Sequence, residues 1–261
     1  TLIIPELMRI LVDEEGLLWE EAWEITRNCV AYTNHTILAE ALEKWPIRLF
    51  QPLLPRIYTI TEEIHRRFEI ELKETYGEHS PKVNNMAIIK DGLIHMANLA
   101  IVGSFSVNGV AKLHTEILKD ITMHDFHVHY PNKFNNKTNG ITHRRWLLQS
   151  NPELVKLLDE TIGSGWITNP PELEKLLKYQ DDKKFKIKYQ AMKQARKVAL
   201  AERIEKESGI KLNPNSIFDI HVKRLHEYKR QLLNALHIMY LYNELKENPE
   251  FRKNFHPQSF I

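Results

Sequence analysis

Residues 221–230, with the sequence HVKRLHEYKR, concentrate positive charge in one short stretch. Four of them are lysine or arginine: Lys223, Arg224, Lys229 and Arg230. The stretch follows the apolar run IFDI at residues 217–220 and leads into apolar residues at helical spacing. This order predicts a strand followed by a helix that starts near Leu225. At such a corner the backbone N–H groups, the helix dipole and the cationic side chains all favour an anion, so the stretch is a candidate phosphate-binding site.

Two other interpretations of this cationic stretch stay open on the residues alone. A solvated face is the usual fate of a charge run, and spacing by itself favours that interpretation. Contact with nucleic-acid phosphates is the other. The chain has 36 Lys plus Arg against 34 Asp plus Glu, a net charge of +2, so the cluster is local rather than part of a cationic field. This balance and the absence of interleaved surface aromatics argue against nucleic acid.

The first part of the chain has helical periodicity from residue 5 to about residue 75. Its apolar residues form stripes at helical spacing, one of which is Ile57, Ile60, Ile64, Phe68 and Leu72. These stripes predict helix faces that build a core. Two apolar runs then flank Asp91 and Gly92, a pair typical of a two-residue hairpin turn.

Turns and helices alternate in the rest of the chain. Residues 107–120 predict a glycine-containing turn that opens a helix, and residues 124–145 contain many loop-forming residues. A long, charged, amphipathic helix is predicted near residues 181–208. The apolar run before the cationic stretch is expected to be a buried strand, because its polar content is low and turn residues bound it.

Composition limits the class of protein. The 261 residues are 43% hydrophobic, which is enough for one large core or two modest ones. The single cysteine, Cys29, excludes an internal disulfide, and neither a membrane-length apolar run nor a signal peptide is recognisable. We therefore expect a cytoplasmic protein. Because the sequence starts with TLIIPELM and ends with HPQSFI, we also expect an internal piece of a longer polypeptide.

Four stretches together resemble the α-glucan phosphorylases, the family of glycogen and maltodextrin phosphorylases. They are IPELMRILVDE, AYTNHTILAEALEKWP, NKTNGITHRRWL and SIFDIHVKRLHEYKRQLLN, in the family's order. The resemblance implies an α/β fold, namely a helix-rich segment of a two-domain glycosyltransferase of the GT-B type with Rossmann-like halves. Residues 1–145 would be the C-terminal part of the first domain, and residues 146–261 would begin the second, cofactor-binding domain.

The resemblance also implies an activity. The family uses pyridoxal 5'-phosphate and inorganic phosphate to release glucose 1-phosphate from the non-reducing ends of α-1,4-glucans. The lysine that forms the Schiff base would lie outside this chain, so the chain alone is expected to be inactive. The intact enzyme is expected to be a homodimer that binds neither nucleic acid nor membrane. The alternative is a noncatalytic remnant that keeps affinity for glucan or phosphate.

By resemblance, the cationic stretch supplies most of the catalytic groups. Arg224 and Lys229 would hold the substrate phosphate, and Lys223, together with Lys229, would bind the phosphate of the cofactor. Tyr228 would form a hydrogen bond with a hydroxyl of the reacting glucose. From spacing alone, Tyr228 also fits a buried aromatic residue on a helix face.

The resemblance assigns further contacts in other parts of the chain. His35 would be a catalytic group that meets the hydroxymethyl end of the glucose, and Asn139 would contact another sugar hydroxyl. Trp146 and Val110 would lie beside the cofactor. Without the resemblance, Asn139 would be assigned to a turn and His35 to a structural role. Trp146 and Val110 would be assigned to the core.

Two features of the sequence carry no expected role in the chemistry. Phe105 stands where many members of the family have histidine, so a polar role at that position is in doubt. His124, His127 and His129 are close in sequence, but their spacing fits one helix face poorly. We therefore expect no metal site.

Overall fold

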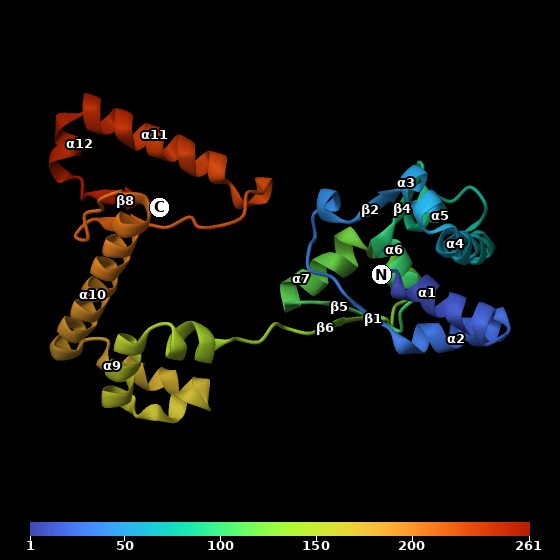
Figure 1. Ribbon diagram of the computed structural model, residues 1–261, viewed down its shortest axis with the longest axis horizontal. Helices are drawn as coiled ribbons and strands as arrows, with labels where there is room; N and C mark the ends of the chain where they lie inside the picture. Colours follow the sequence, from blue (N-terminus) through green and yellow to red (C-terminus); the bar gives the residue numbers. More distant parts are fainter. The chain divides into compact units, whose positions relative to one another are not determined.

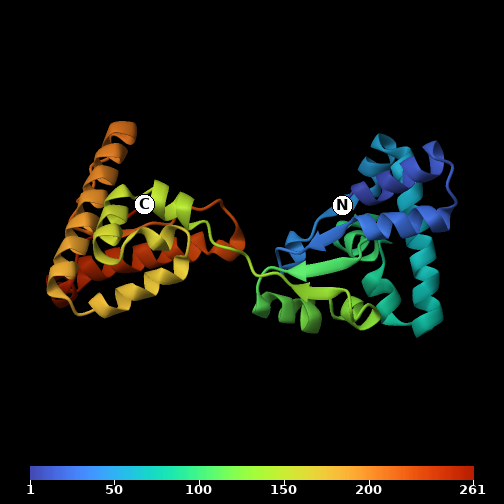
Figure 2. The ribbon, with the colours of Figure 1, turned by 90° about the horizontal axis from the view of Figure 1, so that it is seen from below.

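The computed structural model describes residues 1–261 and consists of many helices and a few short strands (Figures 1 and 2). The internal contacts divide the chain into two units, Thr1–Gly140 and Ile141–Ile261. Both units are rich in helix and have only short strands, so the fold is mixed α/β. No helix is both long enough and apolar enough to cross a bilayer.

The first unit contains two small sheets. Its strands are β1 (Ala31–Thr33), β2 (Lys44–Pro46), β3 (Ile89–Lys90), β4 (Leu93–His95), β5 (Ser106–Gly109) and β6 (Phe134–Asn136). One sheet is parallel with the order β1-β5-β6, and the other is antiparallel with the order β2-β4-β3. In the parallel sheet, Val107 of β5 pairs with Tyr32 on one side and Phe134 on the other.

Helices pack around these sheets and build the core of the first unit. They are α1 (Ile3–Arg9), α2 (Trp19–Cys29), α3 (Ile47–Leu53), α4 (Pro55–Tyr76), α5 (Pro81–Met86), α6 (Met96–Val102), α7 (Lys112–Ile117) and α8 (His124–His129). The stripe predicted on α4 is buried at all five positions, which confirms that helix and its inward face. Phe68 on this stripe stacks against Phe126 of α8, with ring centroids 6.3 Å apart.

The hairpin predicted at Asp91 and Gly92 is present between β3 and β4. Both turn residues have positive φ angles, 54° and 71°, as a two-residue hairpin of this type requires. The second apolar run leaves the sheet after His95 and continues as α6, whose residues are almost all buried. A continuous apolar run can be a buried helix as well as a strand, so the sequence pattern did not separate these two outcomes.

Residues 124–145 contain more regular structure than their loop-forming composition predicted. Helix α8 begins at His124, and β6 adds the third strand of the parallel sheet. Tertiary packing explains the difference, because Phe126 and Phe134 are both buried in the core of the unit. The side chains of the three α8 histidines do not form a common cluster with other potential metal ligands. The Nε2 atom of His129 lies 2.9 Å from Glu71 Oε1 on α4.

The second unit is mostly helical. Its α-helices are α9 (Pro152–Ile162), α10 (Lys183–Ser208), α11 (Gln231–Glu247) and α12 (Pro249–Asn254), and its strands are β7 (Ile217–Asp219) and β8 (Gln258–Phe260). The predicted long helix is α10, and its ends follow from local chemistry. The Asp182 carboxylate accepts hydrogen bonds from the N–H groups of Lys184 and Phe185, and Gly209 ends the helix in a left-handed conformation.

Two expectations about the corner after β7 are wrong. The predicted strand is present but not buried, since it pairs only with β8 and Ile217 is 49% exposed. The helix begins at Gln231 rather than near Leu225, because residues 220–226 form an irregular loop that ends in a 3₁₀ turn at Glu227–Lys229. Leu225 is 87% exposed in this loop.

Candidate active site

Three loops of the first unit meet at the carboxyl edge of the parallel sheet. Asn34 and His35 follow β1, Val110 follows β5, and Asn139 lies shortly after β6. The carboxyl ends of parallel strands share one edge, which is where ligands bind in open α/β sheets. Backbone hydrogen bonds join the loops here: the Asn34 N–H donates to the Asn108 carbonyl at 2.9 Å, and the Asn139 N–H donates to the Val110 carbonyl at 3.0 Å.

A close approach between β5 and α7 fixes the position of Val110. A Cβ atom on Gly109 would lie 3.0 Å from both Cα and N of Thr115, so only glycine fits at the end of this strand. The Thr115 hydroxyl donates to the Ala111 carbonyl at 2.9 Å and lies 3.2 Å from the Asn136 side-chain oxygen, which ties the first turn of α7 to the end of β6.

His114, in the first turn of α7, links two of these loops. Its Nδ1 atom accepts a hydrogen bond from the Val110 N–H at 3.1 Å, and its Nε2 atom lies 3.1 Å from the Asn34 side-chain oxygen. Burial, and to a smaller extent the charge of His35, hold the pKa of His114 below its usual value of 6.5. The imidazole is therefore neutral at neutral pH.

The structure thus brings together three of the residues expected to contact sugar or cofactor. His35 and Asn139 are exposed at this edge, and Val110 is half-buried. The spacing of these residues, which are far apart in sequence, gave no sign of this proximity. The sheet produces it, because each residue follows a different parallel strand.

The cationic stretch of the second unit is folded back against the start of α11. The Gln231 side chain donates to the Arg224 carbonyl at 3.0 Å, and the Asn234 side-chain nitrogen lies 3.3 Å from His221 Nδ1. Arg230, with φ at 57°, makes the sharp change of direction into the helix and provides no side-chain cap. The cations therefore lie in the loop directly before an α-helix, as expected. The helix itself starts six residues later than the sequence indicated, at Gln231 rather than near Leu225.

The cations of this loop have no acidic partner within the chain. No ion pair involves Lys223, Arg224 or Lys229, and helix α11 has no acidic residue in its first turn. Lys223 and Arg224 are exposed and Lys229 is half-buried, with its Nζ atom 5.7 Å from the centre of the Tyr228 ring. Cations placed before a helix N-terminus can hold a phosphate group.

Tyr228 and Trp146 are the two aromatic residues expected at the site in the second unit. Tyr228 is 57% exposed and packs its ring beside His226, with ring centroids 4.5 Å apart, so it is not a buried helix-face residue. Trp146 lies in the π-helical turn Arg144–Gln149 and is 72% exposed, so it is not a core residue in this chain either. No hydrogen bond or ring contact joins Trp146 to the cationic stretch.

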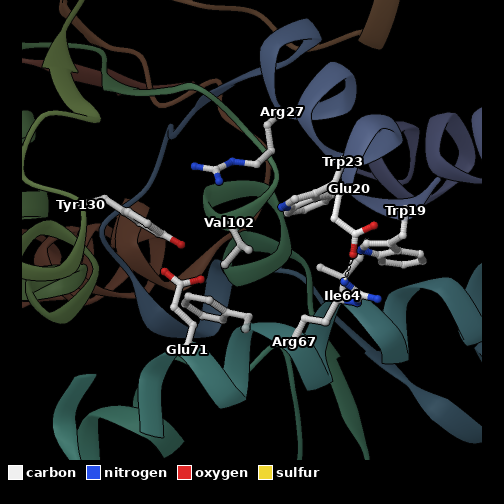
Figure 3. Close-up of a pocket in the computed structure, with 10 residues that line it drawn as sticks. Trp19, Glu20, Trp23, Arg27, Ile64, Arg67, Glu71, Val102 and Tyr130 are labelled. Carbon is white, nitrogen blue, oxygen red and sulfur yellow. Dashed lines mark hydrogen bonds and ion pairs between the residues drawn. The ribbon is translucent and has the colours of Figure 1, made fainter. Parts of the chain in front are cut away.

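An aromatic pocket of the first unit lies elsewhere and contains none of the expected residues. It has a volume of about 250 Å³ and lies between α2 and α4 (Figure 3). Two of its charged groups pair with each other: Arg67 lies 2.9 Å from Glu20, and its guanidinium lies over the Trp19 ring at 4.9 Å from the ring centre. Glu71 at the other end contacts His129.

Comparison with known proteins decides the family. A sequence model of the carbohydrate phosphorylases matches residues 1–261. The chain belongs to the carbohydrate phosphorylase family. It is 56% identical over 260 residues to the glycogen phosphorylase of Bacillus subtilis (strain 168), covering 100% of this chain and 32% of that protein. It is 48% identical over 264 residues to the muscle form of glycogen phosphorylase from Bos taurus, covering 100% of this chain and 31% of that protein.

Membership of the carbohydrate phosphorylase family confirms the resemblance that the four stretches indicated. The brain form of glycogen phosphorylase from Rattus norvegicus is also 48% identical, over 263 residues. The chain spans about a third of the length of these relatives.

Sequence reasoning missed three residues that shape the edge of the sheet: Asn34, Gly109 and His114. Two signals were present in the sequence. A histidine three residues after a helix cap can reach back to a free N–H group, as glutamate does in a capping box. An asparagine two residues before a threonine favours a local side-chain turn. Neither signal identifies the partner on another strand, which only the fold provides.

Proposed function

We propose that this chain is part of an α-1,4-glucan phosphorylase, a hexosyltransferase that uses phosphate to release glucose 1-phosphate from the non-reducing ends of glycogen or maltodextrin. The observation that carries the proposal is the match of the whole chain to glycogen phosphorylases at 48–56% identity. The unpaired cations before α11 support it, because the reaction needs a site for inorganic phosphate. The partners are therefore an α-1,4-glucan, inorganic phosphate and glucose 1-phosphate.

The proposal extends to architecture. A GT-B fold with two Rossmann-like domains would place residues 1–145 in the first domain and residues 146–261 in the second. The parallel sheet with loops at its carboxyl edge and the parallel pair β7–β8 are compatible with this assignment. A homodimer stays a prediction from the resemblance, and a cytoplasmic setting stays a prediction from composition.

The residues before α11 fit the phosphate group of pyridoxal 5'-phosphate as well as the substrate phosphate. The donor set consists of two ammonium groups and one guanidinium group, and Glu227 is the one carboxylate within residues 221–230. Lys223 and Lys229 would hold the cofactor phosphate. When bound, the cofactor supplies a second phosphate for proton exchange with the substrate phosphate.

The chain's own residues would contribute charge and orientation. Two phosphate groups brought close together repel each other, and fixed cations offset this repulsion most strongly where water is excluded. Arg224 can grip a phosphate with two parallel N–H groups, which holds the nucleophile against the sugar. Tyr228, His35 and Asn139 would orient the glucose through its hydroxyl groups, each supplying a donor or an acceptor.

Phosphate-dependent release of glucose 1-phosphate tests this function. The full-length enzyme that contains this chain, loaded with cofactor, is incubated with maltoheptaose and inorganic phosphate, and the product is followed by phosphorus NMR. We expect α-glucose 1-phosphate with phosphate and none without it. A loaded enzyme that binds maltoheptaose but forms no glucose 1-phosphate would instead support the noncatalytic alternative.

A further inference from the structure

Both ring nitrogens of His114 are engaged, and their partners fix its tautomer. The Val110 N–H can only donate, so Nδ1 must accept that hydrogen bond at 3.1 Å. In the neutral imidazole the proton then sits on Nε2, which donates to the Asn34 side-chain oxygen at 3.1 Å. The lowered pKa of His114 keeps the ring in this neutral form.

Asn34 connects His114 to the loop that carries His35. Its side-chain oxygen also accepts the Thr36 N–H at 3.0 Å, which closes a local turn around His35. Its side-chain nitrogen donates to the Tyr32 hydroxyl at 3.1 Å, and the residue is 1% exposed. His35 is thus the exposed tip of a turn whose base is held by His114.

The other side of the His114 ring acts on the loop after β6. Val110 donates its N–H to His114 and accepts the Asn139 N–H at its carbonyl, at 3.0 Å. One imidazole is therefore linked by hydrogen bonds to the turn that carries His35 and to the backbone of Asn139, the two residues of the first unit proposed to touch the sugar. Helix α7 positions it, since Thr115 and Gly109 hold the first turn of that helix against β5.

We propose that His114 is a positioning residue for sugar recognition, acting through Asn34 on the loop that presents His35 to the hydroxymethyl end of the glucose. The proposal rests on the proposed phosphorolysis and on the assignment of His35 to that end of the sugar. The Nε2–H donor of His114 sets recognition of the hydroxymethyl group, while its Nδ1 acceptor holds the Val110 N–H in the loop before α7.

Two variants separate these two roles of the ring. In His114→Asn, an amide oxygen near the position of Nδ1 keeps the bond from Val110, but the side chain is too short to reach Asn34. In His114→Gln, an amide N–H near the position of Nε2 keeps the bond to Asn34. The control is His124→Asn, because His124 is exposed on α8 and the hydrogen bond of its ring goes to the Lys119 carbonyl, away from the edge of the parallel sheet.

The readout is competition by glucose and by xylose, which is glucose without its hydroxymethyl group. Inhibition constants against glucose 1-phosphate are measured with the full-length, cofactor-loaded enzyme, and the melting temperature is recorded for each variant. We expect His114→Asn to weaken glucose binding by roughly tenfold, the discrimination that one hydrogen bond provides, and to leave xylose binding unchanged. His114→Gln and His124→Asn should keep the preference for glucose.

Each departure from this pattern overturns the proposal. If glucose and xylose weaken together in His114→Asn, or if neither does, the ring has only a structural role or none. The same conclusion follows if His114→Gln loses the preference as His114→Asn does, or if the wild-type enzyme does not prefer glucose. A wild-type enzyme that forms no glucose 1-phosphate contradicts the proposed function, which is a separate result.

Discussion

Replacing Gly109 with alanine tests the packing that brings the three loops together. The new Cβ would lie 3.0 Å from Cα and N of Thr115 and closer still to its hydroxyl oxygen. That hydroxyl has little freedom to move, since it is hydrogen-bonded to the Ala111 carbonyl and lies 3.2 Å from the Asn136 side-chain oxygen. Moving the backbone instead would strain the Thr115 N–H bond to Ala111, which is 2.9 Å long.

The expected cost follows from two opposing effects. Overpacking of this kind destabilises a protein by about 1–3 kcal/mol. Replacing glycine by alanine also reduces the entropy of the unfolded chain, which stabilises the protein by about 0.4–1 kcal/mol. The net loss for Gly109→Ala is then roughly 1–2 kcal/mol, or a midpoint shift on the order of 0.7 M urea at a slope of about 2 kcal/mol/M.

Gly140→Ala is the matched control for this measurement. A Cβ on Gly140 meets no atom within 4 Å, and its φ angle is not positive, so we expect no loss of stability. Adding Thr115→Ala to Gly109→Ala removes the nearest obstructing atom and should recover part of the loss. Urea unfolding with the same midpoint for Gly109→Ala and Gly140→Ala would refute the packing argument.

Three further predictions concern the chain and its first unit. The 261-residue chain alone should form no glucose 1-phosphate from maltoheptaose above a buffer control, because it lacks the cofactor lysine implied by the family resemblance. Leu72→Ala, at a fully buried site on α4, should lower the free energy of unfolding by about 2–5 kcal/mol, whereas Ile70→Ala on the exposed face should cost less than about 1 kcal/mol; similar losses in urea unfolding would contradict the assigned helix face. Burial, then the charges of Lys90 and Lys44, lowers the pKa of His95 to about 4. The unfolded state therefore takes up a proton first, so stability should fall as pH drops from about 6.5 to about 4, and His95→Gln should flatten that profile.

Patterns that depend on neighbouring residues in sequence predicted their elements well. The stripe on α4 and the Asp91–Gly92 turn are both set by local geometry, and both are present. The sequence placed the start of α11 too early because Leu225 continues the apolar spacing of the helix. In the structure the loop continues to Arg230, whose backbone is left-handed, and the Gln231 side chain holds the loop through the Arg224 carbonyl. Burial of β7 could not be predicted, since it depends on how many strands pair beside it.

The candidate site likewise has one part that local sequence predicted and one part that only the fold brings together. Charge density identified the cationic stretch directly, because residues within ten positions of each other are necessarily close. The edge that joins His35, Val110 and Asn139 depends on the order of parallel strands, which no spacing in the sequence reveals. His114 was missed for this reason: its partner Asn34 is 80 residues away in the chain.

The most direct test of the central claim is the catalytic efficiency for phosphate of Arg224→Ala compared with Arg230→Ala, in the full-length enzyme with its cofactor content verified. If Arg224 grips the substrate phosphate, its loss should lower kcat/KM by about a hundredfold, on the order of 3 kcal/mol, while Arg230→Ala stays near wild type. Arg224→Lys should rescue poorly, because an ammonium group lacks the two parallel N–H donors. An Arg224→Ala enzyme that retains its cofactor and turns over like wild type at all phosphate concentrations would show that HVKRLHEYKR is a solvated charge run.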